Sequence, residues 1–324
     1  MPSLLKSVFA VLGLALAPLV AFAQAGDYPN RPIRFIAPIP AGGSTDVLTR
    51  DIAHRLQERW GQPTVVENKP GGTGSIGAAL VARAPADGYT LLLVNSGHVI
   101  NGHVYAKLAY DPIKDFVPIV HVASFGMGLF VNPAVPAKNL SEFVALARAK
   151  PGSLSFATSG NGGAGHLGGE LIKAALGIEM VHVPYRGSAP AIADVVAGQV
   201  PVSIADVPLA GPHVRAGALR PIALGAAHRS AALPEMPTFA ELGVPNLEFS
   251  VWVGFLAPAG TPAAIVDKLN REIVAITREP AMQARLRELG FEAVASTPAE
   301  FERTMKTDYE RYGEVVRKAG IKAD

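Results

Sequence analysis

Two glycine-rich loops carry the residues best suited to chemistry, and the chemistry they suggest is the binding of an anion. In residues 38–46, Pro-Ile-Pro-Ala-Gly-Gly-Ser-Thr-Asp, the prolines stiffen the loop and the glycines let backbone approach a ligand closely. Ser44 or Thr45 can then open a helix, whose free backbone N–H groups and dipole would face a carboxylate. Residues 158–163, Thr-Ser-Gly-Asn-Gly-Gly, repeat this design. We expect the two helix N-termini to grip one anion, mainly through neutral donors; two ordinary helix caps are the alternative.

Four further side chains have the right chemistry to complete such a site. Arg186 could pair with a carboxylate as a fork, or it could brace its own loop through carbonyl groups. Asp206 ends a predicted strand and could accept a hydrogen bond from a ligand amine or hydroxyl, or it could cap the next helix. His98 and His166 are expected in loops of the cleft, although a lone histidine is often structural. The predicted ligand-binding residues are Pro40, Ala41, Gly42, Gly43, Ser44, Asp46, Ser96, His98, Thr158, Ser159, Gly160, Gly163, His166, Arg186 and Asp206.

The same sequence also contains partial matches to the motifs of other functions. Residues 72–77 and 163–168 both match the G-x-G-x-x-G pattern of dinucleotide-binding proteins, but neither has an acidic residue at the expected distance on a strand end. Ser159, His166 and Asp206 suggest an exported hydrolase as the alternative function, although no G-x-S-x-G turn surrounds the serine. The chain has no cysteine and no H-E-x-x-H motif. We therefore expect a binding protein without catalytic activity, cofactor or metal.

Strands and helices alternate along the chain, which predicts an α/β fold whose mainly parallel sheets are covered by helices. Two apolar segments, residues 117–131 and 247–256, are interpreted as crossovers between two lobes. The first lobe would then comprise residues 27–124 and 250–324, and the second lobe residues 125–249. Two lobes on a double hinge form a cleft, and small ligands favour such a place.

The N-terminus has the pattern of a secretory signal peptide over residues 1–23. Lys6 precedes a short apolar run, and Ala21-Phe22-Ala23 is a small-x-small cleavage site. The 29 Lys and Arg residues nearly balance the 27 Asp and Glu residues, so no global field favours nucleic acid. These features predict an exported protein that does not bind nucleic acid, and we expect a monomer.

Short motifs in a fixed order resemble one protein family from about Tyr28 to the end of the chain. They are Tyr28-Pro29-x-Arg31-Pro32-Ile33, Pro38-x-Pro40-x-Gly42-Gly43-x-x-Asp46, Val66-Glu67-Asn68-Lys69-Pro70-Gly71-Gly72-x-Gly74, Ala84-x-x-Asp87-Gly88-Tyr89-Thr90, Asp111-Pro112-x-x-Asp115-Phe116, Thr158-x-Gly160, His166-Leu167-x-Gly169-Glu170 and Val183-Pro184-Tyr185-Arg186-Gly187. This set is similar to that of the Bug-type (TctC-like) periplasmic solute-binding proteins, the receptors of tripartite tricarboxylate transporters.

The resemblance implies a two-lobed type II periplasmic-binding-protein fold with the ligand in the interlobe cleft. It also implies a location in the periplasm, an organic acid, amino acid or related small molecule as ligand, and one large and one small integral-membrane subunit as partners. In such proteins the first strand–helix loop and loops of the second lobe meet the ligand, often through ordered water. The family varies widely in the molecule that its members bind, so the resemblance names a ligand class only.

Overall fold

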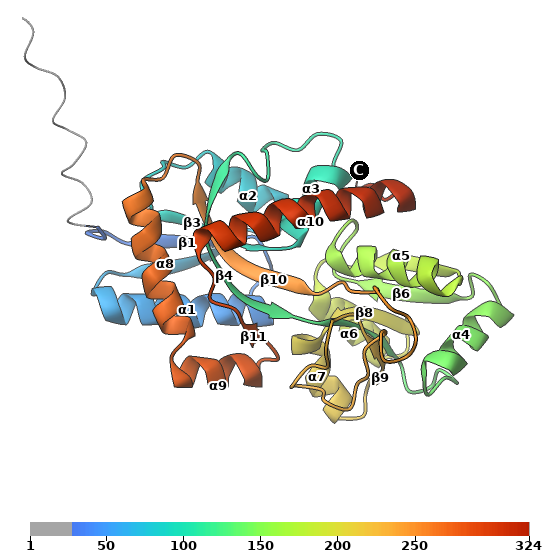
Figure 1. Cartoon of the computed structure of the whole chain (residues 1–324). Helices are drawn as coiled ribbons and strands as arrows, with labels where there is room; N and C mark the ends of the chain where they lie inside the picture. The colour runs from blue at the N-terminus through green and yellow to red at the C-terminus, as the bar shows by residue number, and fades with distance from the viewer. Residues whose placement is uncertain (1–27, 324) are drawn as a thin grey trace, which may run out of the picture.

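The computed structural model describes residues 28–323, which form two lobes, each built on one β-sheet (Figure 1). The first lobe holds a six-stranded sheet in the order β11-β4-β10-β3-β1-β2. Its strands are β1 (Ile33–Ala37), β2 (Thr64–Asn68), β3 (Thr90–Asn95), β4 (Phe116–Phe125), β10 (Val251–Pro258) and β11 (Glu292–Ala293). Its helical segments are α1 (Ser44–Trp60), the 3-10 turn η1 (Gly72–Gly74), α2 (Ser75–Ala82), α3 (Gly97–Val104), α8 (Ala263–Thr277), α9 (Pro280–Glu288) and α10 (Pro298–Ala319).

The second lobe holds a five-stranded sheet in the order β7-β6-β8-β5-β9. Its strands are β5 (Met127–Val131), β6 (Leu154–Thr158), β7 (Met180–Pro184), β8 (Val202–Asp206) and β9 (Arg220–Leu224). Its helices are α4 (Leu140–Ala149), α5 (Ala164–Leu176), α6 (Ser188–Val196) and α7 (Val207–Arg215). The two lobes confirm the predicted α/β fold class. The residue boundaries of the lobes stay a prediction, and the predicted signal peptide lies outside the described residues.

Alternation of side chains along the strands explains why helices cover both faces of the first sheet. Phe35 on β1 belongs to an apolar cluster with α1 and α8, whereas its neighbour Ile36 faces a second cluster with α2, α3 and α10. Leu91 and Leu92 on β3 divide in the same way. A strand that is apolar on both faces therefore has a helix layer on each side.

The sheets are mixed, and the prediction of mainly parallel sheets is wrong in this respect. β1 runs parallel to β2 and β3, but β10 is antiparallel to both β3 and β4. In the second sheet, β5 is antiparallel to β8 and β9. The physical reason is the connection between the lobes. β4 passes through Gly126 directly into β5, and β10 carries the chain back, so these connecting strands run against their neighbours.

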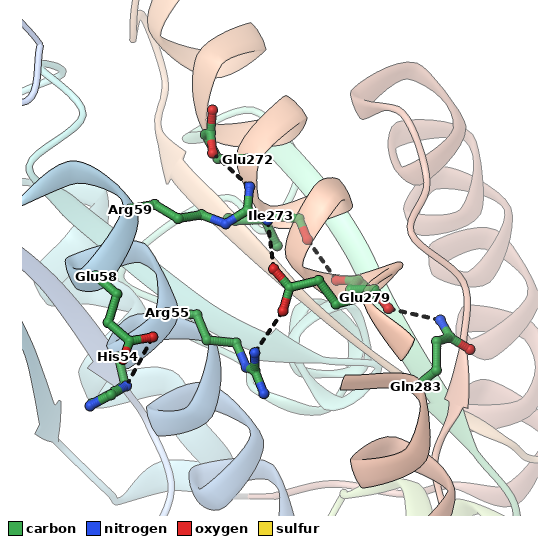
Figure 2. A network of polar contacts seen from close by, with 9 residues as sticks. His54, Arg55, Glu58, Arg59, Glu272, Ile273, Glu279 and Gln283 are labelled. Atoms are coloured by element: carbon green, nitrogen blue, oxygen red, sulfur yellow. Dashed lines mark hydrogen bonds and ion pairs between the residues drawn. The ribbon is translucent and has the colours of Figure 1, made fainter. Parts of the chain in front are cut away.

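Polar contacts fasten α1 to the C-terminal helices on the outside of the first lobe (Figure 2). Glu279 accepts a hydrogen bond of 2.6 Å from Arg55 and another of 2.6 Å from Arg59, and Arg59 also reaches Glu272. One carboxylate thus joins two arginines of α1 to the junction of α8 and α9. Within residues 28–323, no helix is long and apolar enough to cross a membrane.

Candidate ligand-binding site

The β1–α1 loop is held from inside by Asp46. The buried carboxylate of Asp46 accepts hydrogen bonds from the Gly42 N–H at 3.0 Å, from Arg50 Nε at 3.0 Å and from Asn68 Nδ2 at 2.8 Å. Burial acts to raise the pKa of Asp46, but hydrogen bonds from Arg50, Gly42 and Asn68 outweigh it and hold that pKa below its ordinary value. Asp46, which the sequence suggested as a ligand contact, is therefore occupied in bracing the loop, as is the Gly42 N–H.

The N-terminus of α1 remains open. Gly43 is the N-cap residue in an extended conformation (φ −73°, ψ 159°), and no side chain caps the helix. The first helical hydrogen bond runs from the Val47 N–H to the Gly43 carbonyl, and the N–H groups of Ser44 and Thr45 have no partner among the described residues. A Cβ atom placed on Gly43 would meet nothing within 4 Å. Backbone donors and the helix dipole therefore face open space.

The N-terminus of α5 repeats this arrangement in the second lobe. Gly163 is its N-cap residue (φ −82°, ψ 176°), again without a side-chain cap. The preceding loop is held by side chains behind it: Thr158 Oγ1 donates to the Gly160 carbonyl at 3.1 Å, and His166 Nδ1 accepts from the Gly162 N–H at 3.0 Å. His166 lies in α5 and not in a loop, so the predicted position of this histidine is wrong.

The loops of the two lobes touch one another. Thr73 Oγ1, in the first lobe, donates a hydrogen bond of 3.1 Å to the carbonyl of Asn161, in the second. A Cβ atom placed on Gly187 would lie 3.5 Å from Cγ of Pro40, and one placed on Gly163 would lie 3.5 Å from Cγ2 of Thr73. Residues 38–43, 71–74, 158–163 and 185–188 thus gather at one place between the lobes. Helix α6, which begins after Gly187, adds a third N-terminus without a side-chain cap.

Two residues of this contact, Thr73 and Asn161, were missed by the sequence reasoning. Thr73 has a left-handed backbone (φ 50°) within a run of glycines. In the sequence this run stands out by its match to the G-x-G-x-x-G pattern, and its glycine content is the signal that could have indicated close backbone approach. Ser159 and Gly160, which the sequence did predict, lie beside Asn161; the Ser159 carbonyl accepts from the Gly187 N–H at 3.1 Å and so joins the second-lobe loops.

Arg186 and Asp206 differ in how far their polar groups are already used. Arg186 is exposed, and its guanidinium has no hydrogen bond or ion pair within the described part of the chain, so it does not brace its loop. Asp206 is buried: one oxygen accepts from Ser188 Oγ at 2.9 Å and the other caps α7 through the Leu209 N–H at 3.0 Å. Burial raises the pKa of Asp206. Of the two, Arg186 is the side chain available to a ligand.

His98 belongs to the core of the first lobe, so its predicted position in a cleft loop is wrong. It lies in α3, its ring stacks on Tyr110 at 5.5 Å between centroids, and Nε2 is 2.9 Å from the Pro112 carbonyl. Burial lowers its pKa to about 4. Val99, Ile100 and Val104 of the same helix belong to the buried apolar cluster that contains Tyr110, so α3 packs into the core. Ser96, at the N-cap position of α3, is also fully buried.

The residues suggested for a hydrolase do not form a catalytic chain. His166 uses Nδ1 to accept from Gly162, and its Nε2 lies 4.0 Å from Glu170. Asp206 is bonded to Ser188 and Leu209, and no hydrogen bond joins Ser159, His166 and Asp206 to one another within residues 28–323. In the same residues, no group of three or more His, Asp or Glu side chains is placed to hold a metal ion.

Comparison with known proteins assigns this chain to one family. The sequence model of the tripartite tricarboxylate transporter family receptor matches residues 48–321. Protein BugT of Bordetella pertussis is 36% identical over 319 residues, which is 97% of this chain and 98% of BugT. The solved structure of R. palustris Rpa4515 with adipate is 38% identical, with a TM-score of 0.87 over 91% of this chain and 99% of that one.

MatC from Rhodopseudomonas palustris, solved with bound malate, is 30% identical, with a TM-score of 0.83 over 89% of this chain and 100% of that one. The family match spans most of the chain, and BugT aligns over nearly its whole length. The fold likeness to Rpa4515 and MatC covers both lobes. This chain therefore belongs to the receptor family of the tripartite tricarboxylate transporters, whose members are solute-binding proteins.

Proposed function

We propose that this protein is a periplasmic receptor that closes its two lobes around a small mono- or dicarboxylate and delivers it to a membrane transporter. The observation that carries the proposal is a pair of uncapped helix N-termini, at Gly43 of α1 and Gly163 of α5, each preceded by a loop that contacts the other lobe. The adipate of Rpa4515 and the malate of MatC support a carboxylate as the ligand class. Family membership supports a pair of integral-membrane subunits as the partners.

Neutral donors are sufficient for such a site. Closing the lobes excludes water, and each hydrogen bond to the carboxylate becomes stronger in the less polar surroundings. A micromolar dissociation constant corresponds to about −8 kcal/mol, which a few charge-assisted hydrogen bonds of roughly 1.5–3 kcal/mol each can supply beyond the cost of closure. Arg186, whose guanidinium has no partner within residues 28–323, can meet a second carboxylate as a bidentate partner.

A ligand screen tests the proposal directly. The chain without residues 1–23 is melted in the presence of adipate, malate and a panel of other mono- and dicarboxylates, and each compound that raises the melting temperature is titrated by calorimetry. We expect saturable binding of at least one carboxylate with a stoichiometry of one. NMR of the same mixtures should show the compound unchanged after prolonged incubation, as required of a receptor. No shift with any carboxylate, or conversion of the bound compound, would contradict the proposal.

A further inference from the structure

Two histidines lie directly behind the second-lobe loop that meets the first lobe. His166 on α5 accepts the Gly162 N–H through Nδ1 at 3.0 Å, and its ring is largely buried. An acceptor nitrogen carries no proton, so the neutral ring must hold its proton on Nε2. Gly162 has a left-handed backbone (φ 72°) and directly precedes Gly163, the N-cap residue of α5. One hydrogen bond to an unprotonated nitrogen therefore fixes the backbone that presents the helix N-terminus.

The second histidine braces the other end of the same loop. The His182 ring stacks on the His166 ring, with centroids 3.8 Å apart and planes 13° apart. His182 Nε2 lies 2.7 Å from Thr158 Oγ1, whose hydroxyl proton is donated to the Gly160 carbonyl. His182 must therefore be the donor to Thr158. Through Thr158 and Gly162, the stacked pair holds both ends of residues 158–162.

Burial favours neutral rings and outweighs the charged groups around the pair. On α5, Glu170 lies 4.0 Å from His166 Nε2 and raises the pKa of that ring, but Lys173 binds the same carboxylate at 2.9 Å and offsets part of its charge. β7 contributes His182, and β6 contributes the uncharged Phe156 and Thr158. Burial lowers the pKa of His166, and burial together with His166 and Lys173 lowers the pKa of His182 to about 3. Both rings are therefore neutral at neutral pH.

We infer that His166 is a positioning residue for the proposed carboxylate site: its unprotonated Nδ1 holds residues 158–163 in the shape that grips the ligand, and a proton on that nitrogen releases the loop and weakens binding. A protonated ring places an N–H where the Gly162 N–H already points, so two donors face each other and the bond is lost. A second charge on the stacked ring would add repulsion, and a cation in the first turn of α5 opposes the helix dipole. The inference rests on the proposed function, because the loop it concerns forms part of that site.

A direct test follows the Gly162 amide without any ligand. Protein labelled with ¹⁵N-glycine is used to measure the exchange protection factor of that amide between pH 7.5 and pH 4.5. We expect protection to fall at least tenfold on acidification in the wild type. His166→Asn keeps an acceptor oxygen close to the position of Nδ1 but does not titrate, so its protection should be independent of pH. His166→Gln places its amide beyond that position and should lose protection at every pH. An unchanged wild-type protection factor, or the same loss in His166→Asn, would overturn the inference.

A second measurement links the loop to binding. Calorimetric titration with adipate at pH 7.5 and pH 5.0 should show a dissociation constant that rises at least fivefold more in the wild type than in His166→Asn. Adipate itself takes up protons over this pH range in both titrations, so the comparison with His166→Asn removes that contribution. Equal pH profiles in the two proteins would contradict a positioning role. Failure of both proteins to bind adipate would exclude adipate, but not the other carboxylates of the screen, as the ligand, and the amide-exchange result would still decide the inference about His166.

Discussion

The side-chain amide of Asn161 donates a hydrogen bond of 2.8 Å to the main-chain carbonyl of Lys322, which ties the second-lobe loop to the end of the chain. The following residue, Ala323, is itself held by the Val104 carbonyl at 2.9 Å, so the tail is anchored on α3 of the first lobe. Figure 1 shows the end of α10 lying above α5, across the junction of the lobes. Asn161 therefore makes a contact that exists only when the lobes are together.

Replacing Asn161 should weaken ligand binding through closure. In Asn161→Ala the hydrogen bond to Lys322 is lost, whereas the Asn161 carbonyl that accepts from Thr73 is retained. A net hydrogen bond contributes about 1 kcal/mol, so we expect about a fivefold rise in the dissociation constant. Calorimetry measures the change, and Thr73→Ala should give a rise of similar size. Unaltered affinity in both variants would show that these contacts do not contribute to closure.

Gly43→Leu should abolish binding while the protein still folds. The extended backbone of Gly43 suits any residue, and a Cβ atom there would meet no atom of residues 28–323 within 4 Å, so we expect the substitution to be tolerated by the fold. The leucine would instead fill the place in front of the α1 N-terminus. We expect at least a hundredfold loss of affinity in calorimetry, with a melting temperature within a few degrees of the wild type. Gly43→Ala has a smaller side chain, so its affinity for the ligand should lie between those of the wild type and Gly43→Leu. Full affinity in Gly43→Leu would place the site elsewhere.

The sequence predicted the glycine loops and the α/β fold because these depend on local properties. Free φ at glycine, fixed φ at proline and alternating apolar strands can be recognised in the chain itself. The roles of individual polar residues could not be recognised in this way. Asp46 and Asp206 have the chemistry of ligand contacts, but Arg50, Asn68 and Ser188 occupy their oxygens. These partners are brought together by tertiary packing, which no spacing in the sequence specifies.

The mixed sheets and the missed contact between Thr73 and Asn161 have the same origin. The direction of β10 depends on where the chain re-enters the first lobe, which lies far from the local pattern of that strand. Thr73 and Asn161 are 88 positions apart and meet only because the lobes close. Sequence patterns therefore predicted which loops would approach a ligand, whereas only the structure shows which polar atoms of those loops remain without a partner among residues 28–323.

Arg186 should affect binding without affecting stability. Its guanidinium is exposed and makes no ion pair or hydrogen bond in residues 28–323, so Arg186→Gln should change the free energy of unfolding by less than about 0.5 kcal/mol. A charge-assisted bond to a second carboxylate is worth about 1.5 kcal/mol or more, which predicts at least a tenfold weaker affinity for a dicarboxylate. A monocarboxylate should lose less. Arg271 on α8 is also exposed and has no hydrogen bond or ion pair within residues 28–323, so Arg271→Gln is the matched control and should bind as the wild type does.

Acid should destabilise the first lobe through His98. Its pKa is about 4 in the folded protein, because burial disfavours the imidazolium, against an ordinary value of about 6.5 when unfolded. At pH values between these two pKa values, the histidine binds a proton more readily in the unfolded chain than in the folded protein. The contribution of neutral His98 to stability is therefore complete above pH 6.5 and is lost as the pH falls towards 4. The difference corresponds to at most about 3 kcal/mol.

Urea unfolding of the wild type and His98→Gln at pH 7.5, 5.5 and 4.5 measures this contribution. Glutamine retains an N–H that can donate to the Pro112 carbonyl but does not titrate, so the variant should lose about 2 kcal/mol less than the wild type on acidification. His121, whose pKa burial also lowers to about 4, continues to titrate in both proteins, so the variant keeps part of the pH dependence. Parallel profiles for the wild type and His98→Gln would mean that His98 is not the group that acid protonates on unfolding.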